Sequence, residues 1–168
     1  FSQLELPSHA LLGEHLLEFA MNGTHAPALG NRHRYFAPQG CYPCKGEDAW
    51  VTLSIRSDSE WQRFCDVVGQ AGWKTDARFA TAPARRKNHD ELDRLISEWT
   101  RERSHYEAMM VLQKHAIPSG AVLNMQEVAH DPHLKVRNYF ESGVGGSDKP
   151  VVGVPFKLSE TPGQVRWK

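Results

Sequence analysis

The chain has 168 residues, the size of one ordinary domain, and is long enough to bury roughly two thirds of its unfolded surface around a core. Twenty basic residues balance twenty acidic ones, so the excess positive charge typical of proteins that bind nucleic acid or anionic membranes is missing. No apolar run reaches the roughly 18 to 20 residues that a membrane-spanning helix needs, and no signal-peptide pattern is present. The three cysteines form an odd and sparse set, which suits a reducing compartment. We therefore expect a soluble cytoplasmic protein that binds neither nucleic acid nor membrane.

The first expected element is an amphipathic helix. Ser8 fits the N-cap position, apolar residues recur at helical spacing from Leu12 to Ala20, and Gly23 supplies a C-terminal stop. Residues 24–40 then show no period and contain several prolines and glycines, which predicts a long connector of the kind that often carries function. The chain begins with Phe1 and lacks an evident closing element, so we expect a fragment of a longer protein.

A β-hairpin is expected next. Residues 42–44 and 50–55 flank the turn-rich segment 45–48. In the second run apolar residues alternate with Thr52 and Ser54, which predicts one buried face.

Capping-box patterns mark two of the helices that follow. Ser57 with Glu60, ahead of an apolar stripe at 61, 64, 65 and 68, predicts a helix that ends near Gly72. Ser104 with Glu107 predicts another, with its apolar residues at 109, 110 and 112. A helix between these two has an inner face that consists of Leu92, Leu95, Ile96 and Trp99.

The remaining pattern predicts strands and one short helix. Residues 117–123 fit a short strand that joins the hairpin sheet, and Asp131 before a proline fits a helix start. Residues 140–144 and 151–154 predict a second hairpin around the loop 145–150. The fold class expected is α+β, with a small, mostly antiparallel sheet covered by helices.

Residue chemistry alone supports no metal or catalytic site. Cys41 and Cys44 are ligand types that zinc prefers, but a structural site needs four ligands and no second pair completes it, so both are expected to be small core residues. A redox pair would need a strand before it and a helix after it, whereas a turn and a strand follow. The glycines near 145 fit a hairpin turn better than a phosphate loop, and the basic run 85–87 is expected to be a solvated face.

Among the nine histidines, His33 is the most suggestive, because it lies in the aperiodic segment 31–36 among polar groups and rings. The favoured interpretation is still a hydrogen-bonded, partly buried ring. His130 and His133 flank a helix cap and are expected to be exposed.

Seven short segments form an ordered set that covers nearly the whole chain. They are LGNRH (29–33), APQGCYPC (37–44), GEDAWV (46–51), DARFAT (76–81), IPSGAV (117–122), DPHL (131–134) and PFKLSETPG (155–163). In their order and intervals, which carry the specificity, these segments closely resemble the class III CoA-transferases of the CaiB/BaiF, formyl-CoA transferase-like type.

The resemblance implies a domain organisation. Family enzymes are about twice this length or more, with a small α+β domain inserted into a large Rossmann-like domain. Residues 1–39 would then be a large-domain helix and linker, 40–123 the small domain, and 124–168 the return segment toward the large domain. Family enzymes form interlocked homodimers, so a homo-oligomer is implied. Leu12, Leu16 and Phe19 would lie on a helix without its packing partner and leave an exposed apolar patch.

The resemblance also implies the chemistry. The family moves CoA from an acyl thioester to a carboxylic acid through an aspartyl-CoA intermediate. The nucleophilic aspartate lies in the N-terminal half, so no residue of this chain is expected to be catalytic and the chain alone is expected to be inactive. CoA or acyl-CoA would be a substrate, with no permanently bound cofactor and no metal.

The same resemblance implies a substrate-binding segment, because in relatives the loop before the first small-domain strand lies over the active site. Gly40 would let an acyl group approach the backbone, and Gln39 would donate to a carbonyl or carboxylate oxygen. The alternative is a simple turn before a strand, and a non-catalytic α+β binding or interaction module remains the second hypothesis for the function. The expected site residues are Asn31, Arg32, His33, Pro38, Gln39 and Gly40.

Overall fold

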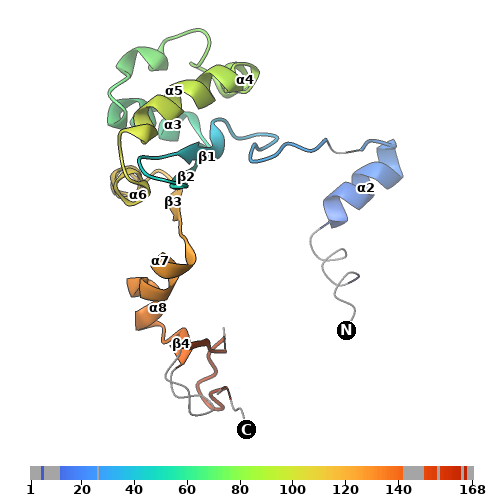
Figure 1. The fold of residues 1–168 in the computed structure, drawn as a ribbon. Coiled ribbons are helices and arrows are strands. Elements are labelled where there is room, and N and C mark those ends of the chain that lie inside the picture. The colour runs from blue at the N-terminus through green and yellow to red at the C-terminus, as the bar shows by residue number, and fades with distance from the viewer. Residues whose placement is uncertain are drawn as a thin grey trace.

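A compact head and two arms make up the chain (Figure 1). The structure is a computed structural model that describes residues 5, 12–25, 27–141, 150–154, 156–163 and 165. The head, defined here as residues 37–123, contains every residue of the buried hydrophobic cluster among the described residues. None of the described helices is long and apolar enough to cross a membrane.

The head is built on a three-stranded antiparallel sheet in the order β1-β2-β3. Its strands are β1 (Gln39–Pro43), β2 (Trp50–Ser54) and β3 (Ser119–Val122). Tyr42 pairs with Val51, and Leu53 pairs with Ser119. The predicted hairpin and the strand that joins it are therefore confirmed. The first strand begins earlier than predicted, so Gln39 and Gly40 lie in β1 rather than in a loop before it.

Helices cover one face of this sheet. They are α3 (Asp58–Val67), a 3-10 turn at Ala71–Lys74, α4 (Ala82–Lys87), α5 (His89–Arg101) and α6 (His105–Lys114). α5 packs on β1, and α6 packs on β2 and β3. Because side chains alternate along a strand, Val51 and Leu53 face these helices and are buried, as is Ile55 just beyond β2. The predicted α+β architecture is confirmed.

The helix caps follow the predicted residues, with one difference. Ser104 and Glu107 form a complete capping box. The Ser57 hydroxyl accepts the Glu60 N–H, but the Glu60 carboxylate accepts the N–H of Arg56 at 2.7 Å, one residue before the cap. α3 ends at Val67 rather than near Gly72, and a 3-10 turn occupies the predicted end.

The buried faces of these helices consist of the apolar residues that the sequence predicted, except at one residue. The stripe of α3 is buried, and the predicted inner face of α5 is buried or packed against the core. Met110 of α6 is exposed instead, because the buried side of that helix is formed by Ala108 and Leu112.

Arg85 is a correction to the expected solvated face. Its side chain is only 1% exposed, whereas Arg86 and Lys87 are exposed as predicted. The Arg85 guanidinium donates to the carbonyl oxygens of Ala37 at 2.7 Å and Phe79 at 3.0 Å. It also pairs with Asp58 at 2.7 Å and lies 5.0 Å from the ring centre of Trp61. The first residue of the basic run points inward, because α4 turns that side of the helix toward the core.

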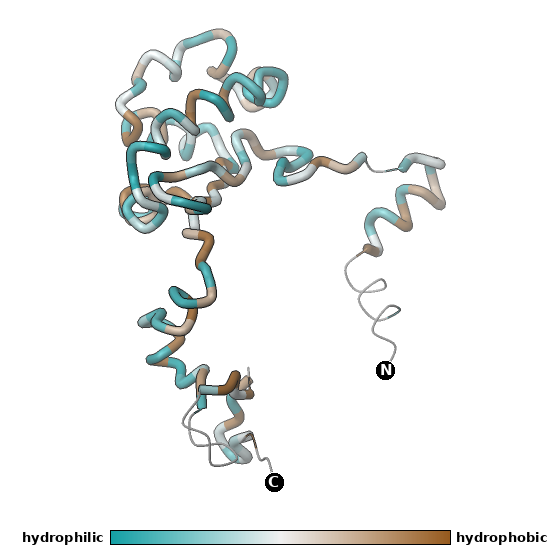
Figure 2. The backbone as a smooth tube through the Cα atoms, viewed as in Figure 1, coloured by the Kyte–Doolittle hydropathy of each residue, from teal (hydrophilic) through white to brown (hydrophobic). Residues whose placement is uncertain are grey.

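The N-terminal arm carries α2 (Gly13–Asn22), which stands apart from the head (Figure 1). It ends as predicted at Gly23, whose φ of 64° is the left-handed conformation that favours glycine. The predicted cap at Ser8 lies outside the described residues. Leu12, Leu16 and Phe19 are all exposed, so the predicted apolar patch is present. Figure 2 shows hydrophobic residues, in brown, at intervals along α2.

The C-terminal arm carries two short helices and a small hairpin. Asp131 caps α8 by accepting the Leu134 N–H, as predicted, while the cap of α7 at Asn124 was not predicted. The predicted second hairpin is present, and residues 142–149, which include the end of its predicted first strand and most of its loop, lie outside the described residues. The elements are α7 (Met125–His130), α8 (Pro132–Val136), β4 (Phe140–Glu141) and β5 (Val151–Val152), the last two antiparallel.

Candidate functional site

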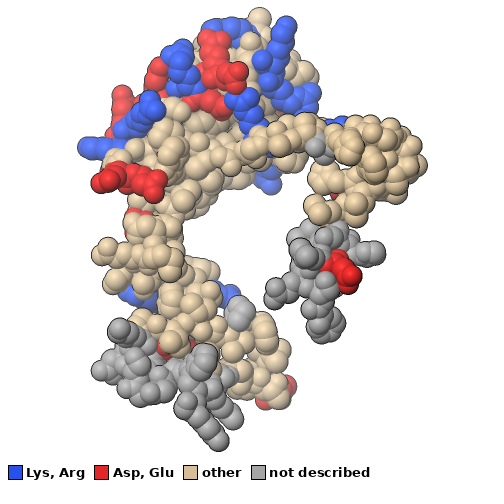
Figure 3. All heavy atoms as spheres, turned by 45° about the vertical axis from the view of Figure 1, so that its right-hand side comes forward, with Lys and Arg blue, Asp and Glu red and all other residues tan. Residues whose placement is uncertain are grey.

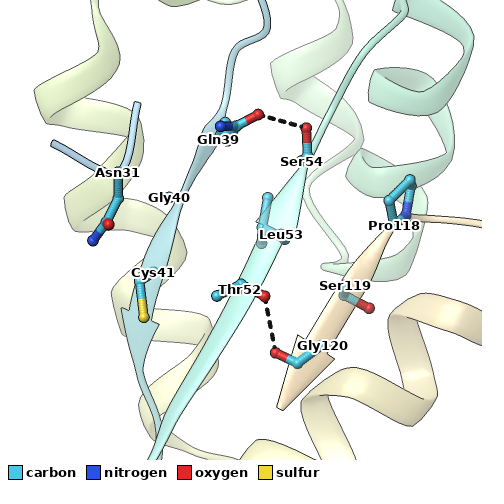
Figure 4. A pocket seen from close by; sticks show the side chains of 10 residues that line it. All are labelled: Asn31, Gln39, Gly40, Cys41, Thr52, Leu53, Ser54, Pro118, Ser119 and Gly120. Carbon is cyan, nitrogen blue, oxygen red and sulfur yellow. Dashed lines mark hydrogen bonds between the residues drawn. The ribbon is translucent and has the colours of Figure 1, made fainter. Parts of the chain in front are cut away.

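The face of the sheet that points away from the helices is the candidate site. Strand pairing places Gln39 opposite Ser54, and Cys41 opposite Thr52, with Gly120 on the other side of Thr52. These five residues therefore share one face, and none of them is buried. Figure 4 shows them side by side on three strands.

A cavity of about 400 Å³ lies against this face. No lysine, arginine, aspartate, glutamate or histidine lines it, so its polar groups are amides, hydroxyls, backbone atoms and one thiol. The lining residues are Asn31, Gln39, Gly40, Cys41, Thr52, Leu53, Ser54, Pro118, Ser119 and Gly120.

Two hydrogen bonds order the polar side chains of the cavity (Figure 4). The Ser54 hydroxyl donates to the side-chain oxygen Oε1 of Gln39 at 2.9 Å, and the Thr52 hydroxyl donates to the carbonyl of Gly120 at 3.1 Å. Within the part of the chain that the structure describes, the Gln39 nitrogen Nε2 makes no hydrogen bond to protein. The cavity therefore presents a free amide donor.

A second cavity, of about 260 Å³, shares Asn31, Gln39, Gly40 and Cys41 with the first. It also reaches the ion pairs of Arg32, which is 2.5 Å from both Asp90 and Asp93 on α5. The hydrogen bond from Arg32 lowers the pKa of Asp90, and burial raises the pKa of Tyr42. The Tyr42 hydroxyl donates to Asp93 at 2.9 Å, so this network ties the connector and β1 to α5.

His89 of α5 holds the backbone of Gln39. Its ring is 5% exposed, and its Nε2 accepts the Gln39 N–H at 3.3 Å, which requires a neutral ring with the proton on Nδ1. Asp93 Oδ1 lies 3.5 Å from the same nitrogen and favours the protonated form, but burial has the larger effect and lowers the pKa of His89.

Gly40 has a structural reason to be glycine. A Cβ at this position would lie 2.9 Å from the Cζ and hydroxyl oxygen of Tyr42. The Tyr42 ring cannot easily move away, because it is buried and its hydroxyl donates to Asp93. The predicted role of Gly40 in admitting an acyl group stays a prediction, although the residue does line the cavity.

The six expected site residues are only partly brought together. Asn31, Gln39 and Gly40 line the larger cavity, and Arg32 lines the smaller one, while Pro38 and His33 line neither. His33 Nδ1 accepts the backbone N–H groups of Tyr35 and Phe36, and its half-buried ring stacks on Phe36 with 4.2 Å between ring centres. This arrangement is the hydrogen-bonded ring that the sequence favoured.

The sequence did not identify the part of the cavity that β2 and β3 supply. A signal was present, because Thr52 and Ser54 are the polar residues that alternate with the buried ones on β2. Gly120 comes from a strand far along the sequence, so only strand pairing places it there.

Cys44 and two of the aspartates have structural roles. Cys44 is a buried core residue as expected, and burial raises its pKa to about 11. The expectation was wrong for Cys41, which is partly exposed because it points to the open sheet face and lines the cavity. The described residues contain no cluster of three or more histidine, cysteine, aspartate or glutamate side chains suited to a metal ion. Asp48 lies in the hairpin turn and accepts the Trp50 indole N–H, and Asp131 caps α8.

Comparisons with known proteins identify relatives over most of the chain. The model of the family described as "CoA-transferase family III" matches residues 3–168. A formyl-CoA:oxalate CoA-transferase of Rhodopseudomonas palustris is 33% identical over 153 residues, which cover 85% of this chain and 35% of the relative. A probable CoA-transferase of Mycobacterium tuberculosis is 31% identical over 88% of this chain and 18% of the relative. The chain therefore spans about a third or less of the curated relatives it matches.

The fold also matches a solved structure. A CaiB/BaiF family protein from Brucella suis superposes with a TM-score of 0.81 and 22% identity, over 92% of this chain and 40% of that one.

The buried His89 predicts a pH dependence of stability. Because its pKa is lowered from 6.5 in the folded chain, the unfolded chain binds more protons as the pH falls below about 6.5, and the free energy of unfolding decreases. In His89→Gln the decrease between pH 7 and 5 should be smaller, by up to about 1.4 kcal/mol per pH unit, as measured by urea unfolding. His115→Gln, at an exposed histidine of the head, should keep the wild-type slope. Equal slopes for all three proteins would contradict the neutral, buried His89.

Proposed function

We propose that this chain, which belongs to CoA-transferase family III, forms the small domain and connecting segments of an enzyme that moves CoA from an acyl thioester to a carboxylic acid. The share of the relatives that the chain covers, 35% for the Rhodopseudomonas protein, supports a missing remainder. In this proposal residues 1–39 are a large-domain helix and linker, 40–123 the small domain, and 124–168 the return segment.

The uncharged cavity on the open sheet face carries the proposal, as one wall of the acyl pocket. It has polar donors and few bulky side chains, which suits a short acyl group whose other contacts come from elsewhere in the enzyme. Figure 3 shows that charged side chains gather over the head, with few on the surface that borders the space between the two arms. A surface with few charges suits coverage by further protein.

The nucleophile is proposed to be an aspartate outside this chain, which forms an aspartyl-CoA intermediate. No aspartate lines the larger cavity. Those of the head already have partners, since Asp58 pairs with Arg85, Asp66 with Lys74 and Asp76 with Arg78. CoA and acyl-CoA enter as substrates in this scheme, and a cytoplasmic location stays a prediction.

A non-catalytic binding or interaction module of the same fold is the alternative function. The exposed apolar side of α2 favours it, because such a patch marks a surface that contacts protein. Catalytic activity of a longer chain separates the two hypotheses.

The proposed function predicts that the 168-residue chain and a longer protein that contains it differ in CoA-transferase activity. The 168-residue chain alone should give no CoA exchange between formyl-CoA and oxalate, or between other acyl-CoA and acid pairs, and no heat of binding for CoA in titration calorimetry. The same chain joined to its N-terminal half should catalyse exchange. Turnover by the 168-residue chain would mean that one of its own acids is the nucleophile. A longer protein that is folded and inactive with every pair would favour the binding module.

The proposed homo-oligomer rests on the α2 face and predicts self-association. Leu16 and Phe19 are exposed on one helix with no covering element among the described residues. Sedimentation equilibrium should show association of the wild-type chain that Leu16→Glu with Phe19→Glu removes. Met110→Glu, at an exposed apolar residue of the head, should leave association unchanged. A wild-type chain that is monomeric at every concentration would contradict the proposal.

A further inference from the structure

We propose that the head carries a second binding site, for a guanidinium group, in a cleft where the C-terminal ends of α3 and α5 meet. The cleft has a volume of about 500 Å³ and shares no residue with the cavity on the open sheet face. Its residues come from the end of α3, the 3-10 turn and the C-terminal half of α5. It therefore lies on the helical side of the head, and the inference goes beyond the proposed function.

Two helix ends make the electrostatic potential in this cleft negative. The last carbonyl groups of a helix carry a partial negative charge, which favours a cation within about one turn of the end. At the end of α3, the carbonyl oxygens of Val67 and Val68 accept no hydrogen bond within the described part of the chain. The end of α5 lies at the same cleft, so the partial charges of the two helices act on one bound group.

Two carboxylates at the end of α5 add full negative charges. Glu98 and Glu102 both line the cleft and are four residues apart, a spacing at which like charges repel. Glu98 pairs with Arg94 at 2.5 Å. Glu102 pairs with Arg103 at 3.4 Å. Both glutamates are exposed, and such surface pairs contribute little stability, so a bound cation can compete for the carboxylates.

The tryptophan rings of the cleft favour a guanidinium over other cations. The Arg103 guanidinium lies 4.3 Å from the ring centre of Trp99 and donates to the Trp99 carbonyl at 2.7 Å, so this helix end already binds a guanidinium of the chain itself. Trp73 is the second ring of the cleft, and it has no cation over it among the described residues. Its half-buried ring is held in place by stacking on Trp61, with 6.2 Å between ring centres.

These contacts define the ligand. A guanidinium is planar, so its face can lie on the Trp73 ring while its N–H groups donate to carboxylate, amide and backbone oxygens at the edge of the cleft. Glu98, Glu102 and the side chain of Gln70 supply such oxygens. The space admits a small guanidino compound or the arginine side chain of another protein, which present the same group. An uncharged urea of the same shape lacks the charge that the helix ends and carboxylates attract.

The test is an NMR titration of the 168-residue chain that follows the indole N–H signals of Trp73 and Trp99. Each signal is identified by its loss when that tryptophan is replaced by phenylalanine. N-acetylarginine amide should shift both signals, whereas N-acetylcitrulline amide, which carries an uncharged urea in place of the guanidinium, should shift neither. Methylguanidinium separates the two sources of the ligand. An affinity equal to that of N-acetylarginine amide supports a free guanidino compound, and a weaker one supports an arginine side chain.

Two matched double variants test the carboxylates. Glu98→Gln with Glu102→Gln should raise the Kd for N-acetylarginine amide about 3- to 30-fold, and both side chains are exposed, so the fold should be kept. Glu14→Gln with Glu18→Gln, also four residues apart but on α2, should leave the Kd within about twofold.

Three results would overturn the inference: no shift with N-acetylarginine amide, equal shifts with N-acetylcitrulline amide, or the same Kd in both double variants. None of them bears on the transfer of CoA, because the titration needs no turnover. Failure of this site and failure of the proposed function are therefore told apart.

Discussion

The buried guanidinium of Arg85 is the interaction on which the arrangement of the head depends. A buried charge is costly unless it is paired and hydrogen-bonded. Arg85 meets this condition with three acceptors, at Ala37, Phe79 and Asp58, and with the face of Trp61. These groups belong to segments that are separate in the sequence, so one side chain fixes their positions relative to one another.

The candidate site depends on this contact through the connector. Ala37 lies two residues before Gln39, so the bond from Arg85 sets the point where the N-terminal arm becomes β1. Helix α5 then secures the same stretch, because its His89 accepts the Gln39 N–H and its acidic residues bind Arg32. The helices thus support the sheet from one face. Its opposite, polar face is not covered by any described helix and can meet a ligand or further protein.

Local sequence patterns predicted much of the fold, and long-range contacts account for what they missed. The hairpin at 45–48 and the capping box at Ser104 are encoded by neighbouring residues. The direction of Arg85 is not, since it depends on how α4 packs against distant segments. Likewise, Gln39 was predicted from a family resemblance, whereas its partner Ser54 is known only once the strands are in register. The cap at Asn124 had a local signal, an asparagine three residues before Glu127, that was overlooked.

The most direct test of this account compares the free energies of unfolding of Arg85→Met and Arg86→Met in urea. Both substitutions keep an unbranched side chain and remove one charge. Arg85→Met leaves the carbonyls of Ala37 and Phe79 without their donor, so it should lose about 2 to 4 kcal/mol. Arg86→Met, at an exposed side chain, should stay within about 0.5 kcal/mol of the wild type. Equal stabilities for the two variants would contradict the central role of the buried guanidinium.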